Sequence, residues 1–144
     1  MEYKKTALDG NGVVIRLKEG EDINEAVKQI AKKENILSGI VTGLGAAKLA
    51  EIAHWNTKKK KYSTKTLKGM LEIVSLNGNI TRDSENGEPI CHLHIILGKE
   101  DFSVIAGHLV RSEVNPTCEI FILPLKTKIE RKFDTKTGLK LQKL

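Results

Sequence analysis

One segment of this 144-residue chain has the periodicity of an amphipathic helix, and it limits the folds open to the remainder. Asp22 precedes this segment as a capping residue, with Glu25 placed where a capping box requires it. Asn35 can end the helix by adopting the left-handed conformation. The apolar residues between these signals recur at intervals that form a single stripe: Ile23, Ala26, Val27, Ile30 and Ala31. We therefore expect one helix between Asp22 and Asn35.

Most of the remaining chain has the composition of β-strands. Residues 77–79 indicate a turn and residues 83–87 a polar loop. Residues 46–55 are ambiguous, because their alanines, leucine and glutamate favour a helix by propensity. One helix among many strands predicts an α+β fold with a largely antiparallel sheet.

No repeat or Pro/Ser-rich linker divides residues 1–144, so we expect a single domain. The expected strands are residues 12–17, 36–45, 67–76, 90–98, 102–111 and 117–127.

The composition predicts a cytoplasmic protein that does not enter a membrane. No apolar run approaches the roughly 20 residues that a membrane-spanning helix needs. No apolar segment follows the lysines near the N-terminus, as it would in a secretory signal. The two cysteines, Cys91 and Cys118, are too few for a disulfide framework and favour a reducing compartment.

The positive charge of the chain is concentrated in two segments. Residues 56–68 contain six lysines and no acidic residue, and a basic C-terminal segment begins at about residue 126. Such patches can contact nucleic acid phosphates, although a solvated lysine-rich surface is the commoner explanation. The candidate contacts are Lys58, Lys59, Lys60, Lys61, Arg131 and Lys132.

Three of the four histidines lie between Cys91 and Val110 in an otherwise apolar setting. His92 and His94 point to the same face of a strand, because side chains alternate along it. A hairpin closing near residue 100 would place His92 opposite His108 and His94 opposite Ala106. Facing residues of one sheet face lie about 5 Å apart at Cβ. The three imidazoles would then converge, provided that this register holds.

A cluster of three imidazoles predicts a divalent metal site, with zinc as the expected ion. Neutral imidazole is the commonest protein ligand for zinc, at about 2.0–2.1 Å. Three such ligands, His92, His94 and His108, would leave a fourth position open, as in catalytic zinc sites. The alternative is three half-buried histidines that bond to backbone or to acids. Glu72 and Glu119 could support such a histidine or face solvent.

Several motifs occur in one order that resembles the PPC domain, the plants-and-prokaryotes-conserved domain, in its free-standing prokaryotic form. They are Gly43-Leu44-Gly45, Glu72–Ile80 (EIVSLNGNI), His92-Leu93-His94, Gly107-His108-Leu109 and Glu119-Ile120, and the resemblance covers about residues 10–125. It implies a curved, mostly antiparallel sheet with one principal helix packed against it, and a strand at residues 46–55. It also implies a homotrimer and a divalent metal, zinc, at the three histidines.

The resemblance leaves the biochemical role open. Plant members follow an AT-hook, and this chain has no Arg-Gly-Arg-Pro element. The plant core Gly-Arg-Phe-Glu-Ile-Leu is replaced here by Gly69–Val74 (GMLEIV), which lacks the arginine. We expect a homotrimeric, metal-holding module with a DNA-associated or regulatory role and non-specific DNA contacts. The alternative is a zinc-type enzyme acting on a small substrate, which we favour less because Glu100 and Asp101 belong to the expected turn and supply no general base.

Overall fold

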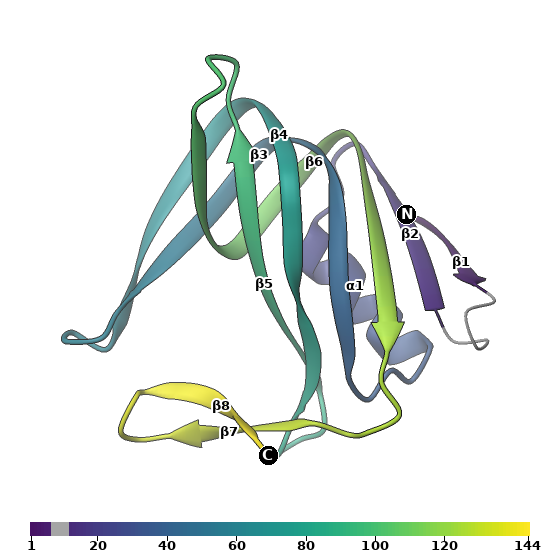
Figure 1. The fold of residues 1–144 in the computed structure, drawn as a ribbon, viewed down its shortest axis with the longest axis vertical. Helices are drawn as coiled ribbons and strands as arrows, with labels where there is room; N and C mark the ends of the chain where they lie inside the picture. The colour runs from purple at the N-terminus through teal and green to yellow at the C-terminus, as the bar shows by residue number, and fades with distance from the viewer. Residues whose placement is uncertain (7–11) are drawn as a thin grey trace.

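The computed structural model describes residues 1–6 and 12–144, and strands make up most of the chain (Figure 1). A single helix, α1, packs against one side of the sheet, and only the β4–β7 pair is parallel among the strand pairs described. The sheet is therefore mixed but mostly antiparallel, strongly curved, and richer in strand than an average α+β protein. The elements are β1 (Glu2–Thr6), β2 (Gly12–Lys18), α1 (Ile23–Lys33), β3 (Gly39–Asn56), β4 (Lys61–Asp83), β5 (Pro89–Gly98), β6 (Val104–Pro124), β7 (Glu130–Asp134) and β8 (Leu139–Lys143).

The long strands close on one another. The strand order is β1-β2-β6-β3-β4-β7-β8, and β5 pairs with both β4 and β6. As a result β3, β4, β5 and β6 form a closed circuit of hydrogen-bonded pairs. Strands of 18 to 23 residues must bend to do this, and β3 has register shifts between Gly43 and Gly45 and between Ala47 and Leu49. Gly45 has a φ of 150°, and a Cβ there would lie 2.4 Å from the Thr117 carbonyl oxygen.

The helix begins and ends where the sequence predicts. Asp22 accepts a hydrogen bond from the Glu25 backbone N–H at 2.9 Å and another from the Ser112 backbone N–H at 2.8 Å. The Ser112 hydroxyl in turn accepts from the Ile23 N–H. Asn35 has a φ of 49°, in the left-handed region. The cap therefore joins the helix to β6 as well as starting it.

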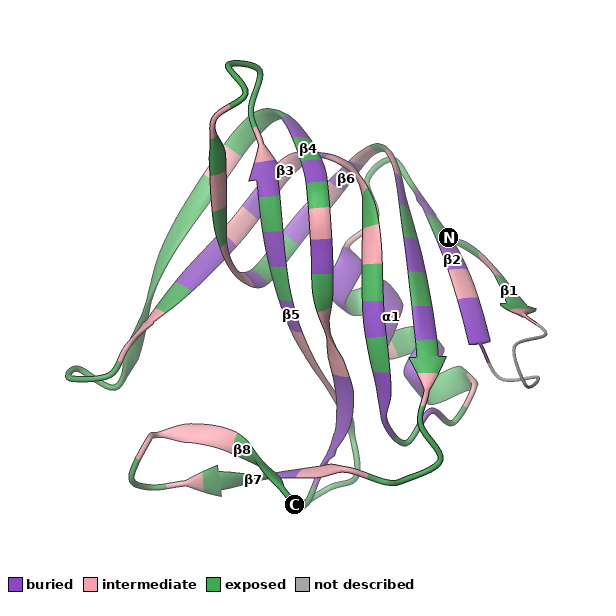
Figure 2. Ribbon diagram, viewed as in Figure 1, coloured by how far each residue is buried: buried purple, intermediate pink, exposed green. Residues whose placement is uncertain are grey.

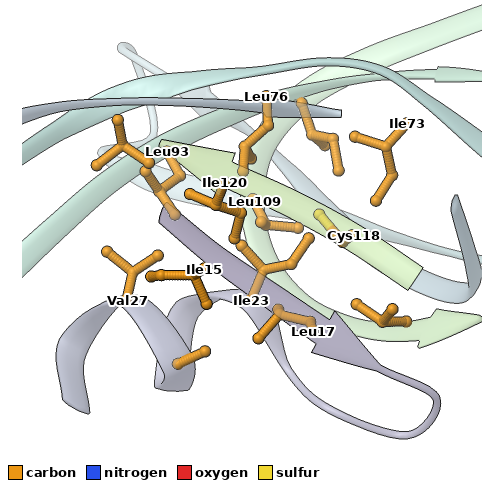
Figure 3. Packing of buried hydrophobic residues seen from close by; sticks show 14 of the residues in the cluster. Ile15, Leu17, Ile23, Val27, Ile73, Leu76, Leu93, Leu109, Cys118 and Ile120 are labelled. Carbon is orange, nitrogen blue, oxygen red and sulfur yellow. The ribbon is translucent and has the colours of Figure 1, made fainter. Parts of the chain in front are cut away.

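The hydrophobic core lies between α1 and the face of the sheet that it covers. All five residues of the predicted apolar stripe of α1 are buried. Exposed and buried bands alternate along the strands, so that one sheet face is inward and the other outward (Figure 2). Figure 3 shows buried side chains of this core, among them Ile15, Leu76, Leu93 and Ile120, all fully buried.

Two expectations about local structure are corrected and a third is confirmed. Residues 77–79 form no turn but lie inside β4, where a Cβ on Gly78 would lie 2.1 Å from the His92 carbonyl oxygen. The glycine at position 78 therefore allows β4 and β5 to approach each other closely. The strands expected at 102–111 and 117–127 are one continuous strand, β6. Residues 46–55 are strand, as the resemblance implied, because pairing with both β4 and β6 overrides their helical propensity.

Among the described residues, no helix has the length and apolarity that crossing a membrane requires.

Arg82 ties the end of the helix to the sheet. Its side chain is 8% exposed and donates to the carbonyl oxygens of Ile36, Ala31 and Gly87, at distances of 2.7 to 3.2 Å. The Ala31 carbonyl also accepts from the Ile36 N–H at 2.9 Å, whereas the carbonyl of the buried Ile36, just beyond α1, has Arg82 as its donor.

We expect Arg82→Met to lower the free energy of unfolding by about 3 kcal/mol, because it leaves the buried Ile36 carbonyl unpaired and removes the charge-assisted hydrogen bonds to Ala31 and Gly87. Urea unfolding followed by circular dichroism measures the change. Arg111→Met is the matched control, since Arg111 is exposed on β6, and should stay within about 0.5 kcal/mol of the unchanged protein. Equal destabilisation of the two variants would contradict the role assigned to Arg82.

Candidate metal centre

The hairpin of β5 and β6 brings His94 and His108 directly opposite each other. The predicted pairing of His92 with His108, and of His94 with Ala106, is wrong by two residues, since Ala106 faces Ile96. The cause is the turn, which closes later: Lys99 N–H donates to the Ser103 carbonyl, and Phe102 adopts a φ of 62°. A shift of two residues preserves the sheet face, so the three imidazoles still converge.

The three rings are spaced as a ligand set would be. Their centroids are 5.0 Å apart for His92 and His94, 5.2 Å for His92 and His108, and 5.6 Å for His94 and His108. One ligand nitrogen from each lies within 4.8 Å of the others. The two Nε2 atoms of His92 and His94 are 3.2 Å apart. Two nitrogens on a tetrahedral zinc would be separated by about 3.3 Å, given a Zn–N distance of about 2.0–2.1 Å.

The surroundings of the cluster favour the neutral form of His92 and His108. Burial, and after it the positive charge of Arg131, lowers the pKa of His92 to about 4. Burial also lowers the pKa of His108, and the nearby His94 adds to this effect. Neutral imidazole is the form that coordinates a metal. The Nδ1 atom of His108 is buried and has no hydrogen-bond partner among the described residues. Buried polar atoms are usually paired, so an unpaired nitrogen here is consistent with a ligand-binding role.

Two residues that the sequence did not connect with the site contact its histidines. Arg131 of β7 is 8% exposed and donates to His92 Nδ1 at 3.2 Å, although the two residues are 39 positions apart. Tyr62 of β4 stacks on His108 with ring centroids 5.3 Å apart, and Trp55 packs against the Tyr62 ring. No local motif marks either contact, because both depend on where β4 and β7 lie relative to β5 and β6.

The remaining candidates divide between the surface and the site. Lys58, Lys59, Lys60 and Lys61 are exposed at the tip of the β3–β4 hairpin, and Lys132 is exposed on β7. Arg131, expected beside them as a DNA contact, is instead buried against His92.

The two basic segments meet in space, since Lys60 Nζ donates to the Thr135 carbonyl at 3.1 Å. Figure 1 shows the tip of the β3–β4 hairpin on the same side as β7 and β8. The acidic candidates do not join the histidines: Glu72 and Glu119 are exposed, and so is the fourth histidine, His54.

The arrangement can coordinate a divalent ion through three neutral nitrogens. Three protein ligands leave room for at least one exogenous ligand. The residues present therefore fit a zinc-type ion, and a metal held here would act as a Lewis acid toward that ligand.

Solved structures from three organisms resemble the chain over nearly its full length. The first is a candidate DNA-binding protein of Bacteroides thetaiotaomicron, with 32% identity, a TM-score of 0.91, and coverage of 99% of this chain and 96% of that chain. The second is a metal-containing protein of Archaeoglobus fulgidus, with 36% identity, a TM-score of 0.84, and coverage of 97% and 95%. The third is a plant- and prokaryote-conserved (PPC) protein of Pyrococcus horikoshii, with 36% identity, a TM-score of 0.85, and coverage of 99% and 95%.

More distant likenesses concern the fold alone. An acetolactate decarboxylase of Bacillus subtilis matches with a TM-score of 0.57 at 14% identity, and this chain covers 54% of its length. No curated protein matches the sequence.

A family model for the Plants and Prokaryotes Conserved (PCC) domain matches residues 4–126, which confirms the resemblance noted from the motifs. The histidine elements and the continuous strands β3, β4, β5 and β6 lie within this match. This chain belongs to the Plants and Prokaryotes Conserved domain family.

Proposed function

We propose that this protein is a homotrimeric module that holds a divalent metal ion, zinc, and associates with DNA without sequence preference in a regulatory or binding role. Residues 1–144 would act as one domain, with the basic segment from about residue 126 as part of its DNA-facing surface. The observation that carries the proposal is the convergence of His92, His94 and His108, whose ligand nitrogens lie within 4.8 Å of one another. Cys91 and Cys118 are free thiols, which supports a location in the reducing cytoplasm.

The donor set supports zinc. Imidazole nitrogens suit zinc, copper, iron and nickel, whereas calcium and magnesium prefer oxygen. The cluster consists of three histidines without a carboxylate, so the site as described offers nitrogen ligands alone. The similar protein of Archaeoglobus fulgidus is described as metal-containing, which agrees with a metal here.

We expect the protein, purified without a His-tag, to contain about one zinc ion per chain by elemental analysis. The variant His92→Ala/His94→Ala should contain almost none, because two of three ligands are removed. His54→Ala serves as the control, since His54 is exposed outside the cluster, and should keep its metal. Equal metal content in all three proteins would contradict metal binding by the three clustered histidines.

The outer face of the sheet supports association between copies. Ile40 of β3 lies opposite Leu123 of β6, and the two are 49% and 44% exposed. Leu44 and Val74 extend this apolar surface and are 58% and 57% exposed. Soluble monomers rarely expose a large contiguous apolar patch, and such patches mark interaction surfaces. A second and third copy of this chain are the occupants that the family resemblance implies.

Light scattering should give a mass of about three times the 16.0 kDa chain. Leu44→Glu should lower the mass toward that of one chain, because a buried unpaired carboxylate opposes the interface. Val110→Glu should leave it unchanged, since Val110 is 41% exposed but lies beside α1, where Asn24 donates to its carbonyl. An unchanged mass for Leu44→Glu would show that the outer face is not the interface.

The basic surface supports DNA association. It comprises Lys58, Lys59, Lys60 and Lys61 at the β3–β4 tip together with Lys132 of β7, brought together by the contact of Lys60 with Thr135. A trimer would carry this surface three times and so gain affinity through multivalency. The similar protein of Bacteroides thetaiotaomicron is described as a candidate DNA-binding protein.

We expect fluorescence anisotropy to detect duplex DNA binding at low salt that weakens steeply as salt rises. The variant Lys58→Gln/Lys59→Gln should weaken binding and lower the salt slope by about one for each phosphate that is no longer neutralised. Lys4→Gln/Lys99→Gln removes the same charge from exposed positions outside both basic segments and should have a smaller effect. No binding of the unchanged protein at low salt would overturn the DNA role.

A metal-dependent enzyme is the second candidate, favoured by the coordination position that three histidines leave open. It receives less support because the cluster of His92, His94 and His108 includes no carboxylate that could serve as a general base. Turnover of a small substrate that a chelator abolishes and zinc restores would support this candidate. Turnover that persists in each single alanine variant of the three histidines would exclude it.

A further inference from the structure

Arg131 is held against the histidine cluster by groups of two other strands. Its buried guanidinium donates to Thr81 Oγ1 and Asn79 Oδ1 of β4 and to the Lys140 carbonyl of β8, each at 3.0 Å. A fourth hydrogen bond joins it to His92 Nδ1 at 3.2 Å. Because the other three bonds fix the guanidinium, it cannot turn away from His92 without disturbing them.

The contact with Arg131 determines which nitrogen of His92 carries the proton. A guanidinium has only N–H donors, so His92 Nδ1 accepts the hydrogen bond and carries no proton. The proton of the neutral ring is therefore on Nε2, since a neutral imidazole carries one. His92 Nε2 lies 3.2 Å from His94 Nε2, which accepts this proton in a hydrogen bond. The three side chains thus form a chain of hydrogen bonds that runs from Arg131 through His92 to His94.

This chain of hydrogen bonds occupies both nitrogens of His92. A metal ion binds the lone pair of an unprotonated nitrogen, but the lone pair of Nδ1 faces Arg131 and Nε2 carries the proton. Coordination at Nε2, the nitrogen that faces His94, requires its proton to leave for water. Nδ1 then takes up a proton from water, so that the ring stays neutral. Nδ1 and the guanidinium would then be two donors facing each other, and their hydrogen bond is lost.

Arg131 is in this respect the opposite of the usual partner of a metal-binding histidine. That partner is a carboxylate, a carbonyl group or a water that accepts the second N–H of the ring, and its removal weakens metal binding about 10–100-fold. Arg131 can only donate, so it stabilises the metal-free form of His92 instead. Removal of Arg131 should therefore strengthen metal binding.

The hairpin of β7 and β8, which carries Arg131, is attached to the sheet over a short stretch. β7 pairs with β4 at two positions, through Glu130 and Arg131, and Lys140 of β8 forms an ion pair with Asp83. A two-stranded hairpin is by itself only marginally stable in water. Loss of one bond of Arg131 should therefore loosen the hairpin, which also carries Lys132 of the basic surface.

We propose that the hydrogen bond between Arg131 and His92 and a metal ion at the histidine cluster exclude each other, so that Arg131 sets the metal affinity and links the metal to the β7–β8 hairpin. The proposal rests on the metal site of the proposed function and adds how that site is regulated. Because coupling between two binding events is reciprocal, metal binding must weaken the hold of Arg131 as much as Arg131 weakens metal binding. A role is thereby assigned to β7, which lies beyond residues 4–126, the part that the family model matches.

The ring nitrogens of His92 test the proposal without any substitution. Nuclear magnetic resonance spectra of the isotope-labelled protein distinguish a protonated ring nitrogen from an unprotonated one. We expect the proton of His92 on Nε2 in the metal-free protein and on Nδ1 after zinc is added. In metal-free Arg131→Met we expect both forms, because the donor to Nδ1 is gone. A proton on Nδ1 of His92 in the metal-free unchanged protein would overturn the proposal.

Zinc affinity, measured by competition with a coloured chelator, tests the sign of the effect. We expect Arg131→Met to bind zinc at least about tenfold more tightly than the unchanged protein, because one hydrogen bond from a charged group no longer competes. Lys132→Met removes an exposed charge from the same strand and should stay within about twofold. Equal or weaker zinc affinity in a folded Arg131→Met would show that Arg131 does not oppose the metal.

Hydrogen exchange tests the link to the hairpin. The backbone amides of β7 and β8 should exchange faster in the zinc-loaded protein than in the metal-free protein. Zinc should change these rates little in Arg131→Met, in which the contact with His92 is already absent. If Arg131→Met loses the pairing of β7 with β8, the ring spectra and the exchange rates of the unchanged protein decide. Equal exchange of the hairpin with and without zinc would overturn the link.

Failure of the metal site and failure of this proposal give different results. An unchanged protein that takes up no zinc, or no more than His92→Ala/His94→Ala, contradicts the metal site and the exclusion together. Zinc uptake that the two substitutions abolish, with the proton of His92 on the same nitrogen before and after zinc, keeps the metal site and overturns the role of Arg131.

Discussion

The double pairing of β5, with β4 along one edge and β6 along the other, is the constraint on which the rest of this structure depends. It closes the circuit of β3, β4, β5 and β6, and it forces strands of 18 to 23 residues to bend at glycines and bulges. The same pairing sets His94 opposite His108. The histidine cluster is therefore built on hydrogen-bonded backbone that the core holds in place, which is how a candidate ligand set is kept pre-organised.

The centre is electrostatically unusual because its nearest supporting residue is a cation. Metal-ligating histidines usually donate their second N–H to a carboxylate or a carbonyl group. Here His92 Nδ1 meets the guanidinium of Arg131, and Asn79 and Thr81 hold that guanidinium in position. Because a guanidinium only donates, this contact leaves the proton of the neutral His92 ring on Nε2, so a metal bound at that nitrogen would have to displace the contact.

The two faces of the sheet divide the remaining functions. The inner face packs against α1 and forms the core, whereas the outer face carries Ile40, Leu44, Val74 and Leu123 in exposed positions. The apolar outer face and the basic hairpin tip are the two surfaces on which the proposed self-association and the proposed DNA contact rest. The contact of Lys60 with Thr135 shows that two basic segments far apart in sequence form one surface.

The sequence by itself determined the elements whose signals are local. The stripe from Ile23 to Ala31 and the cap at Asp22 sufficed for the helix, and alternation sufficed to place three histidines on one sheet face. The family could also be found from its motifs, since these lie in one order along the chain.

Tertiary structure decided what depends on long-range pairing. It made residues 46–55 a strand, placed Gly78 inside β4, and set the hairpin register two residues from the predicted one. It also moved Arg131 from an expected DNA surface to the metal site, because a side chain 39 residues from His92 acquires its neighbours only when the strands assemble.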